Sequence, residues 1–173
     1  TINDFRLSKP LAGTIDTIIE ADHLNMLIVG GMGTGKSSMV HTIIRQYYGQ
    51  DYNTQEFHQN VMFINNLHEQ GISYYRTDIK IFCQTSSVFK SKKKIVVIDD
   101  LDLIPEQSQQ AFRNCIDKYG RTICFLSTCS NNQKVIESIQ SRLAIIKLPP
   151  ITQNIMRTIF DNIVTTEHII VTA

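Results

Sequence analysis

The first residues that could do chemistry form the glycine-rich run at positions 30–37. It reads Gly-Gly-Met-Gly-Thr-Gly-Lys-Ser and matches the P-loop pattern G-x-x-x-x-G-K-[ST] at every required position. Small residues let backbone N–H groups surround a phosphate chain, and the start of a following helix adds a favourable field. Lys36 would contact the β- and γ-phosphates, and the Ser37 hydroxyl would coordinate Mg²⁺. The residues expected to bind a nucleoside triphosphate are Gly30, Gly31, Met32, Gly33, Thr34, Gly35, Lys36 and Ser37.

A second group is the pair of carboxylates that ends the apolar run at positions 95–98. Ile-Val-Val-Ile followed by Asp99 and Asp100 is the pattern of a Walker B segment. At the carboxyl end of a central strand, Asp99 could hold Mg²⁺ and Asp100 could polarise the attacking water. An ordinary strand that runs into an acidic turn looks the same, but the glycine-rich loop upstream favours the Walker B interpretation.

Three further places carry polar groups whose role the residues alone leave open. The sequence Thr-Cys-Ser-Asn at 128–131 either senses the γ-phosphate or is a plain polar strand end. Arg142 is either a finger that stabilises phosphate charge, in cis or in a neighbouring subunit, or a surface arginine. Arg76 and Lys80 lie one helical turn apart and either follow a phosphate backbone or form a solvated face.

The elements that must position these residues alternate along the chain. Short apolar runs predict buried strands at 25–29, 61–64, 95–98, 122–127 and 143–148. Apolar residues at helical spacing predict helices over 37–47, about 73–83, 105–119 and 152–164, and a short helix near 135–138. Strands that alternate with helices predict an α/β fold whose parallel sheet is covered on both faces.

Proline, glycine and charge mark the expected breaks between these elements. Pro10 and Gly13 predict a broken start to the segment before residue 25. The lysines at 92–94 predict a charged turn before the third strand. The double proline at 149–150 predicts the edge of a domain.

Composition is that of a globular protein. The 173 residues are 42% hydrophobic and 19% charged, and the formal net charge is +1, so any surface for nucleic acid must be local. We expect no membrane span, because no apolar run approaches the required ~20 residues, and no secretion signal. The four cysteines form no C-x-x-C pair, which predicts reduced, buried thiols in an intracellular protein.

Several ordered segments between residues 25 and 148 resemble the AAA+ ATPases of the clamp-loader group, and within it the small subunits of replication factor C. Positions 33–37 resemble the family's G-x-G-K-[ST] loop, 98–102 its L-D-E-A-D segment, and 140–143 its Q-S-R-C segment. Further likenesses to the family's motifs are Asn65, 69–72, Arg76, 79–80, 107–113, 128–129 and 136–137.

This resemblance implies a fold and an assembly. The fold is a five-stranded parallel AAA+ P-loop core over residues 1–148, followed by the start of a helical lid over 149–173. The implied activity is ATP hydrolysis with Mg²⁺ in a hetero-oligomer of clamp-loader subunits, which opens a sliding clamp and places it on primer–template DNA. Such a protein would work inside the cell, in the nucleus of a eukaryote, or in the cytoplasm or replication site for a prokaryote or virus.

The resemblance also implies roles for single residues. Asp100 becomes the catalytic base, Ser130 the sensor and Arg142 the finger that reaches a neighbour's ATP. The residues implied to face DNA are Arg76, Lys80 and Arg113.

Two departures from the family pattern keep alternatives open. Asp100 stands where the family has glutamate, and Ser130 stands where it has the sensor asparagine. A carboxylate moved by roughly one bond length can cost about 10²-fold in rate. A nucleotide-binding structural subunit with weak or no hydrolysis is therefore one alternative. Another AAA+ machine, such as a helicase loader, is a second, and a P-loop small-molecule kinase is disfavoured because no acceptor site is evident.

Overall fold

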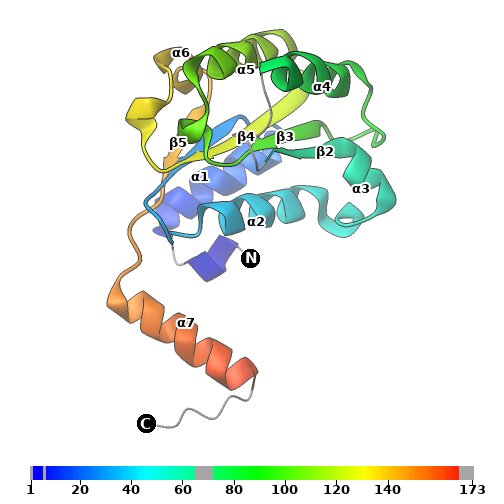
Figure 1. The fold of residues 1–173 in the computed structure, drawn as a ribbon. Coiled ribbons are helices and arrows are strands. Elements are labelled where there is room, and N and C mark those ends of the chain that lie inside the picture. Colours follow the sequence, from blue (N-terminus) through cyan, green and yellow to red (C-terminus); the bar gives the residue numbers. More distant parts are fainter. Residues whose placement is uncertain (1, 6, 65–71, 168–173) are drawn as a thin grey trace.

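A five-stranded parallel sheet lies at the centre of the molecule, with strand order β2-β3-β4-β1-β5 (Figure 1). The computed structural model describes residues 2–5, 7–64 and 72–167. The strands are β1 (Met26–Val29), β2 (Val61–Ile64), β3 (Lys94–Ile98), β4 (Ile123–Cys129) and β5 (Ala144–Lys147). Strand β1, which precedes the glycine-rich loop, lies between β4 and β5, and β3, which precedes the two aspartates, pairs with β4.

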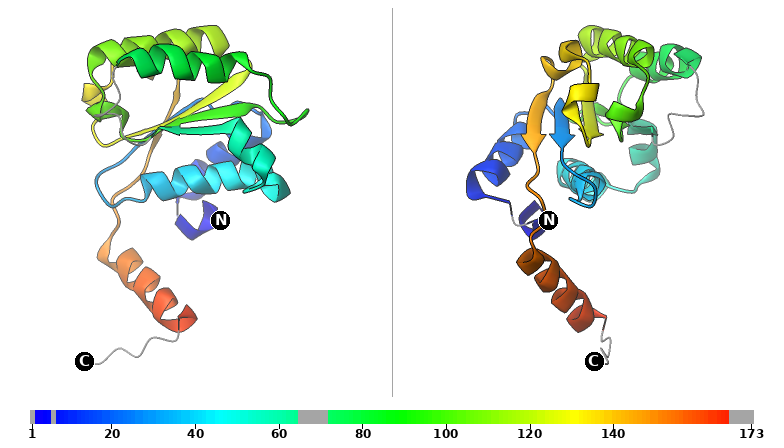
Figure 2. Two further views of the ribbon diagram at one scale, coloured as in Figure 1. Left: turned by 45° about the vertical axis from the view of Figure 1, so that its right-hand side comes forward. Right: turned by 60° about the vertical axis from the view of Figure 1, so that its left-hand side comes forward.

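Helices cover both faces of this sheet (Figures 1 and 2). Helices α1, α2 and α3 lie on one face, and α4, α5 and α6 lie on the other. Their bounds are α1 (Lys9–Glu20), α2 (Lys36–Tyr48), α3 (Gln55–Asn60), α4 (Ile72–Gln84), α5 (Glu106–Tyr119), α6 (Glu137–Gln140) and α7 (Gln153–Thr166). The predicted fold class, a parallel sheet between two layers of helices, is confirmed.

Two hydrophobic cores form because successive side chains of a strand point to opposite faces. In β4, Phe125 belongs to the core under α4 and α5, and Leu126 belongs to the core under α1 and α2. Every residue of β3 and β4 is buried. The carboxyl ends of these two central strands are therefore held rigidly at one edge of the sheet.

Phe112 of α5 is one of the two phenylalanines that anchor the first core. It is fully buried and packs edge-on against Phe125, with ring centroids 5.4 Å apart. Replacing Phe112 with alanine should lower the free energy of unfolding by about 3–5 kcal/mol, because the truncation leaves a cavity. Urea titration of this 173-residue chain measures the loss. Phe160→Ala on α7 is the matched control, since that ring is 53% exposed and should cost less than about 0.5 kcal/mol. A similar loss in both variants would contradict this account.

The predicted break near Pro10 and Gly13 is wrong, because α1 runs through both residues. Pro10 occupies the second position of the helix, where its missing N–H has no intrahelical acceptor to lose. Gly13 costs the helix only about 1 kcal/mol relative to alanine. Burial of Ile15 against the second core outweighs that cost.

The predicted charged turn at residues 92–94 needs a similar correction. Lys94 is the first residue of β3 and is only 3% exposed. Its ammonium donates to the Phe82 carbonyl (2.8 Å) and to the Thr85 side chain, at the end of α4. Helix α3 was not predicted; Thr54 caps it by accepting the Phe57 N–H at 3.2 Å.

The cysteines behave as predicted. All four are free and buried. Burial raises the pKa of Cys83 and Cys129 to about 12 and that of Cys124 to about 11, so these thiols stay protonated at neutral pH. Among the described residues, none of the helices has both the length and the apolarity that crossing a membrane requires.

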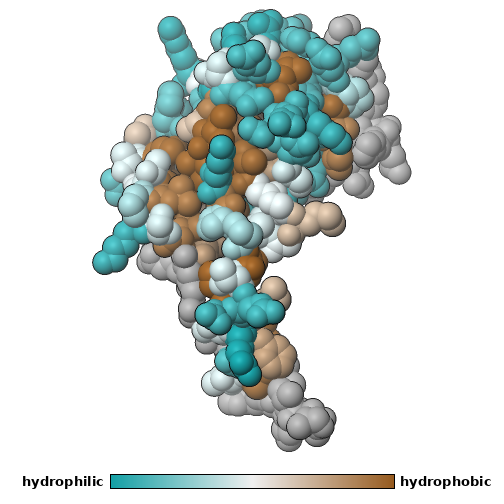
Figure 3. Space-filling view, turned by 90° about the vertical axis from the view of Figure 1, so that its left-hand side faces the viewer, coloured by the Kyte–Doolittle hydropathy of each residue, from teal (hydrophilic) through white to brown (hydrophobic). Residues whose placement is uncertain are grey.

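Helix α7 projects away from the sheet beyond the double proline (Figures 1 and 2). Thr152 caps its start by accepting the Ile155 N–H at 3.4 Å. Several of its apolar side chains are exposed, among them Met156 at 58% and Ile163 at 49%. Figure 3 shows this helix as an extension with apolar and polar surface on different sides. That residues 149–173 begin a lid stays a prediction.

Candidate nucleotide-binding site

The loop between β1 and α2 has a backbone that requires glycine. A Cβ atom built on Gly30 would lie 2.6 Å from the Thr34 hydroxyl oxygen, closer than real Cβ contacts allow. Gly33 and Gly35 have φ angles of 73° and 86°, in the left-handed region that side chains disfavour. The Gly30 N–H donates to the Cys129 carbonyl at 3.1 Å, which joins the loop to the end of β4. The loop is therefore a preformed cradle of small residues.

Helix α2 begins at Lys36, directly after Gly35, and no side chain caps its start. Its first N–H groups are thus available to an anion. The Lys36 side chain is 8% exposed, and its ammonium donates to the Gly31 carbonyl and to the Ser130 hydroxyl, both at 3.1 Å. The lysine therefore already lies along the inside of the loop, where phosphates would be held.

Ser37 and Asp99 form the second part of the site. The Ser37 hydroxyl donates to the Asp99 carboxylate at 2.8 Å, although the two residues are 62 positions apart. A hydroxyl beside a carboxylate is the donor set that P-loop proteins offer to Mg²⁺, which usually keeps several waters. When bound, Mg²⁺ would neutralise charge on the phosphates. Among the described residues no cluster of three His, Cys, Asp or Glu could hold a metal ion.

Asp100 takes an unusual backbone conformation at the end of β3. Its φ and ψ angles are 53° and 52°, and its N–H donates to the Thr128 hydroxyl at 2.9 Å. Burial is the main cause that holds the pKa of the Asp100 carboxyl above its usual range, and the neighbouring Asp99 charge adds to it. The Lys36 ammonium opposes both. A raised pKa makes the carboxylate a better proton acceptor.

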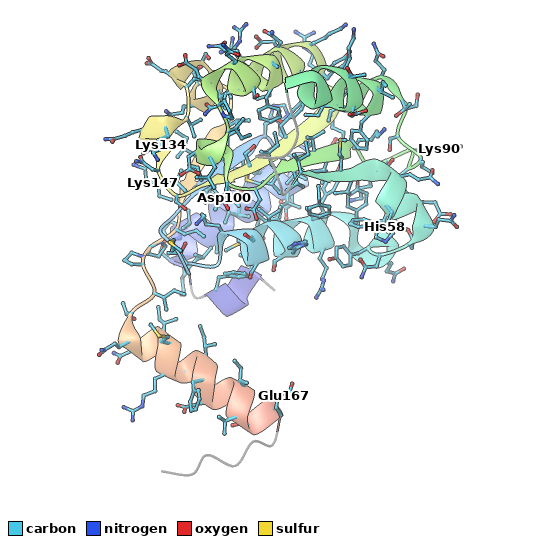
Figure 4. All side chains as sticks on the ribbon, viewed as in Figure 1. His58, Lys90, Asp100, Lys134, Lys147 and Glu167 are labelled. Atoms are coloured by element: carbon cyan, nitrogen blue, oxygen red, sulfur yellow. The ribbon has the colours of Figure 1, made fainter. Side chains whose placement is uncertain are left out.

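A cavity of about 630 Å³ lies beside the glycine-rich loop, and Lys36, Ser37 and Asp100 are among its lining residues. Figure 4 shows Asp100 at this end of the sheet, with Lys134 and Lys147, whereas Lys90 and His58 lie at the other end. The lining residues are Met32, Gly33, Gly35, Lys36, Ser37, Ser38, Asp100, Asp102, Leu103 and Ser130. The N-terminal segment lies close to the glycine-rich loop, because the Phe5 ring is 3.3 Å from the position that a Cβ atom built on Gly35 would occupy.

Comparison with known families agrees with this geometry. Residues 26–150, most of the chain, match the ATPase family associated with various cellular activities (AAA). The chain belongs to the AAA family.

Individual relatives give a more specific similarity than the family does. The chain is 29% identical to replication factor C subunit 3 of Schizosaccharomyces pombe over 96% of its own length and 48% of that protein. It is 28% identical to a putative replication factor C small subunit of Acanthamoeba polyphaga mimivirus, over 97% of the chain and 51% of that protein. The chain thus spans about half the length of these relatives.

A solved structure shows the same fold. It is a DNA polymerase III gamma subunit-related protein of Thermotoga maritima, with a TM-score of 0.69 and 18% identity, over 86% of this chain and 49% of that one.

Arg142, the predicted finger, does not line the cavity of its own AAA core. It lies between α6 and β5, where its guanidinium makes a bidentate pair with Asp117 of α5. It also donates to the Ser138 carbonyl at 2.6 Å. The guanidinium is therefore held at the edge of the core with a defined orientation. Its role as a finger stays a prediction.

The residues predicted to face DNA lie on two neighbouring helices, α4 and α5 (Figure 1). Lys80 is exposed on α4, and Arg113 of α5 pairs with Asp117 at 3.6 Å. Asp117 therefore forms ion pairs with both Arg113 and Arg142. Arg76 belongs to α4 as well, but its side chain lies outside the described part of the structure, as do residues 65–71 of the family resemblance.

Thr128 lies in the predicted polar segment 128–131, but the sequence interpretation assigned the sensor role to Ser130 and gave Thr128 no role of its own. It is fully buried, its hydroxyl donates to Asp99, and it accepts the Asp100 N–H. The sequence pointed to this segment as a polar strand end, but nothing in it showed that the Thr128 hydroxyl would contact both aspartates. Its hydroxyl joins the ends of β3 and β4 beside the carboxylates.

Replacing Thr128 with valine should therefore destabilise the AAA core. Valine has the same shape but leaves the Asp100 N–H and one Asp99 oxygen without their partner, which should cost about 1–3 kcal/mol. Denaturant unfolding measures the loss. Thr158→Val on α7 is the control, because that hydroxyl bonds only the carbonyl one turn earlier in its own helix. Equal stability of Thr128→Val and the unmodified chain would show that the bridge contributes little.

Proposed function

We propose that this chain is the ATP-binding core of a subunit of a DNA sliding-clamp loader. ATP binding would join neighbouring subunits into an assembly that opens a clamp and grips primer–template DNA, and hydrolysis would release both. The protein would work inside the cell, with other loader subunits, the clamp and DNA as partners.

The observation that carries the proposal is the convergence of Lys36, Ser37 and Ser130 on one cavity, with Asp99 hydrogen-bonded to Ser37 beside it. Lys36 and Ser37 open α2, whereas Asp99 directly follows β3 and Ser130 directly follows β4. Membership of the AAA family and similarity to replication factor C subunits support the reading of this cavity as an ATP site in a loader.

Each side chain has a distinct task in the proposed reaction. The loop amides and Lys36 bind the phosphates, and Ser37 and Asp99 hold Mg²⁺. Asp100 takes up the proton of the attacking water. Ser130 senses the γ-phosphate.

The neighbouring subunit would complete the site. Arg142 is exposed away from its own cavity, so it is suited to reach the ATP of an adjacent subunit. Lys80 and Arg113 offer positive charge on α4 and α5 for a phosphate backbone, with Arg76 as a third candidate on α4.

A second candidate function is a structural subunit that binds ATP with little hydrolysis. This candidate is favoured by two short side chains. Asp100 and Ser130 stand where the resembled family has the longer glutamate and asparagine. In that case nucleotide binding would serve assembly alone.

Steady-state ATP hydrolysis by the complete protein with its partner subunits separates the two functions. A loader subunit should hydrolyse ATP faster when primer–template DNA and the clamp are present. Arg142→Ala should lower that rate by roughly 10³-fold, because the finger supplies transition-state charge. Arg121→Ala, an exposed arginine at the other end of the sheet, is the control.

The outcomes decide between the candidates. A rate that DNA and the clamp do not change would favour the structural subunit. An unchanged rate in Arg142→Ala would remove the finger assignment while leaving the nucleotide site in place.

A further inference from the structure

Asp102 makes two contacts that no part of the proposed reaction uses. Its Oδ1 accepts the N–H of Ser130 at 3.2 Å, and its Oδ2 accepts the N–H of Asn131 at 3.0 Å. The residues are 28 and 29 positions apart. One carboxylate thus fixes two successive peptide groups directly after the end of β4.

The segment that Asp102 holds carries a side chain of the nucleotide site. The Ser130 hydroxyl accepts the Lys36 ammonium at 3.1 Å. Asp102 itself lies in the 3₁₀ turn Leu101–Leu103, directly after Asp99 and Asp100, and lines the same cavity as Ser130. The carboxylate therefore ties the turn that follows the Walker B strand to the residue that contacts the P-loop lysine.

A second tie joins the same two strand ends. Thr128 bonds Asp99 and the Asp100 N–H from inside the sheet, whereas Asp102 bonds the Ser130 and Asn131 amides beyond the strand ends. With both ties in place, Ser130 cannot shift relative to the carboxylates without breaking a charge-assisted hydrogen bond.

We propose that Asp102 is a positioning residue that sets Ser130 at the place of the γ-phosphate. The inference rests on the proposed function, in that the loop at residues 30–37 is taken to bind ATP. Asp102 does not touch the nucleotide. It orients the Ser130 peptide, so that the hydroxyl that contacts Lys36 in the present structure can also reach a terminal phosphate held by that lysine.

The position requires a carboxylate and not an amide. Both oxygens of aspartate accept an N–H, whereas asparagine offers one oxygen and places an NH₂ donor against the second N–H. Asp102→Asn is therefore nearly isosteric and disturbs one of the two bonds. We therefore expect this variant to change nucleotide binding more than it changes the stability of the fold.

The experiment measures how well the complete protein distinguishes a triphosphate from a diphosphate. Dissociation constants for the non-hydrolysable analogue AMP-PNP and for ADP, with Mg²⁺, are obtained by calorimetry for four proteins. These are the unmodified protein, Asp102→Asn, Ser130→Ala and the double variant. Asp16→Asn is the matched control, because that carboxylate bonds Gln46 between α1 and α2.

We expect Asp102→Asn to reduce the ratio of the ADP constant to the AMP-PNP constant by about fivefold, with ADP affinity nearly unchanged. Unchanged ADP affinity also shows that the variant is folded. Ser130→Ala should reduce the ratio similarly, and the double variant should fall no further, because both substitutions remove one function. Asp16→Asn should keep the ratio of the unmodified protein.

Two other results would overturn the inference about Asp102 and leave the proposed function standing. One is a ratio in Asp102→Asn within twofold of the unmodified value, and the other is an additive loss in the double variant, which would mean that Asp102 acts independently of Ser130. If Asp102→Asn binds ADP poorly, amide hydrogen exchange is measured on the nucleotide-free protein. Faster exchange throughout the sheet would mean that Asp102 is needed for folding, which contradicts the proposal. Faster exchange confined to Ser130 and Asn131 would support it. If the unmodified protein binds neither nucleotide, the proposed function itself fails.

Discussion

Replacing Lys36 with alanine is expected to weaken ATP binding by about 10²–10⁴-fold. Lys36 is buried against the loop, where its ammonium contacts the Gly31 carbonyl and the Ser130 hydroxyl. In the proposed complex it makes two charge-assisted hydrogen bonds to phosphate oxygens. Each contributes about 1.5–3 kcal/mol, and every 1.4 kcal/mol is a factor of about ten in affinity. Calorimetric titration with ATP and Mg²⁺ measures the change.

The control for Lys36 is another lysine of the same chain. Lys118→Ala removes an exposed lysine from α5, where its ammonium lies 5.2 Å from the centroid of the Tyr119 ring. It should bind ATP as the unmodified chain does. If Lys36→Ala weakens ATP binding by less than about threefold, the loop does not hold phosphates through this side chain.

Replacing Asp100 with asparagine is expected to lower the rate of ATP hydrolysis by about 10²–10⁴-fold while ATP affinity is retained. The substitution removes the proton acceptor and little else. Asparagine tolerates the left-handed conformation of residue 100 as aspartate does, and its N–H can still donate to Thr128. Single-turnover hydrolysis in the complete assembly isolates the chemical step. A robust rate in Asp100→Asn would show that another group takes the proton.

The glutamate variant tests whether the short side chain limits the reaction. Asp100→Glu restores the reach of the resembled family but places a longer residue at φ 53°. The left-handed conformation costs such a residue about 1–2 kcal/mol, which aspartate partly avoids. Faster hydrolysis in Asp100→Glu despite this cost would show that the native site is impaired. A slower rate would show that the backbone of this chain has adapted to aspartate.

The sequence predicted the layers of the fold because each signal is local. The apolar runs at 61–64 and 95–98 and the amphipathic spacing of residues 37–47 need no distant partner to be read. The P-loop was predicted for the same reason, since its lysine, serine and glycines are adjacent. The N-terminal helix was missed because Pro10 and Gly13 break helices in most places, and only burial of Ile15 in the tertiary fold outweighs them.

What the sequence by itself determined is thus the five strands, the helices other than α1 and α3, and the glycine-rich loop. What only the tertiary structure decided is which residues meet there. Lys36 and Ser130 are 94 positions apart, and Ser37 and Asp99 are 62 apart. They meet because the sheet places β1 next to β4 and β4 next to β3, with all carboxyl ends at one edge. Thr128 and Asp102 acquire their contacts from that strand order, because hydrogen bonds depend on distance in space and not on separation along the chain.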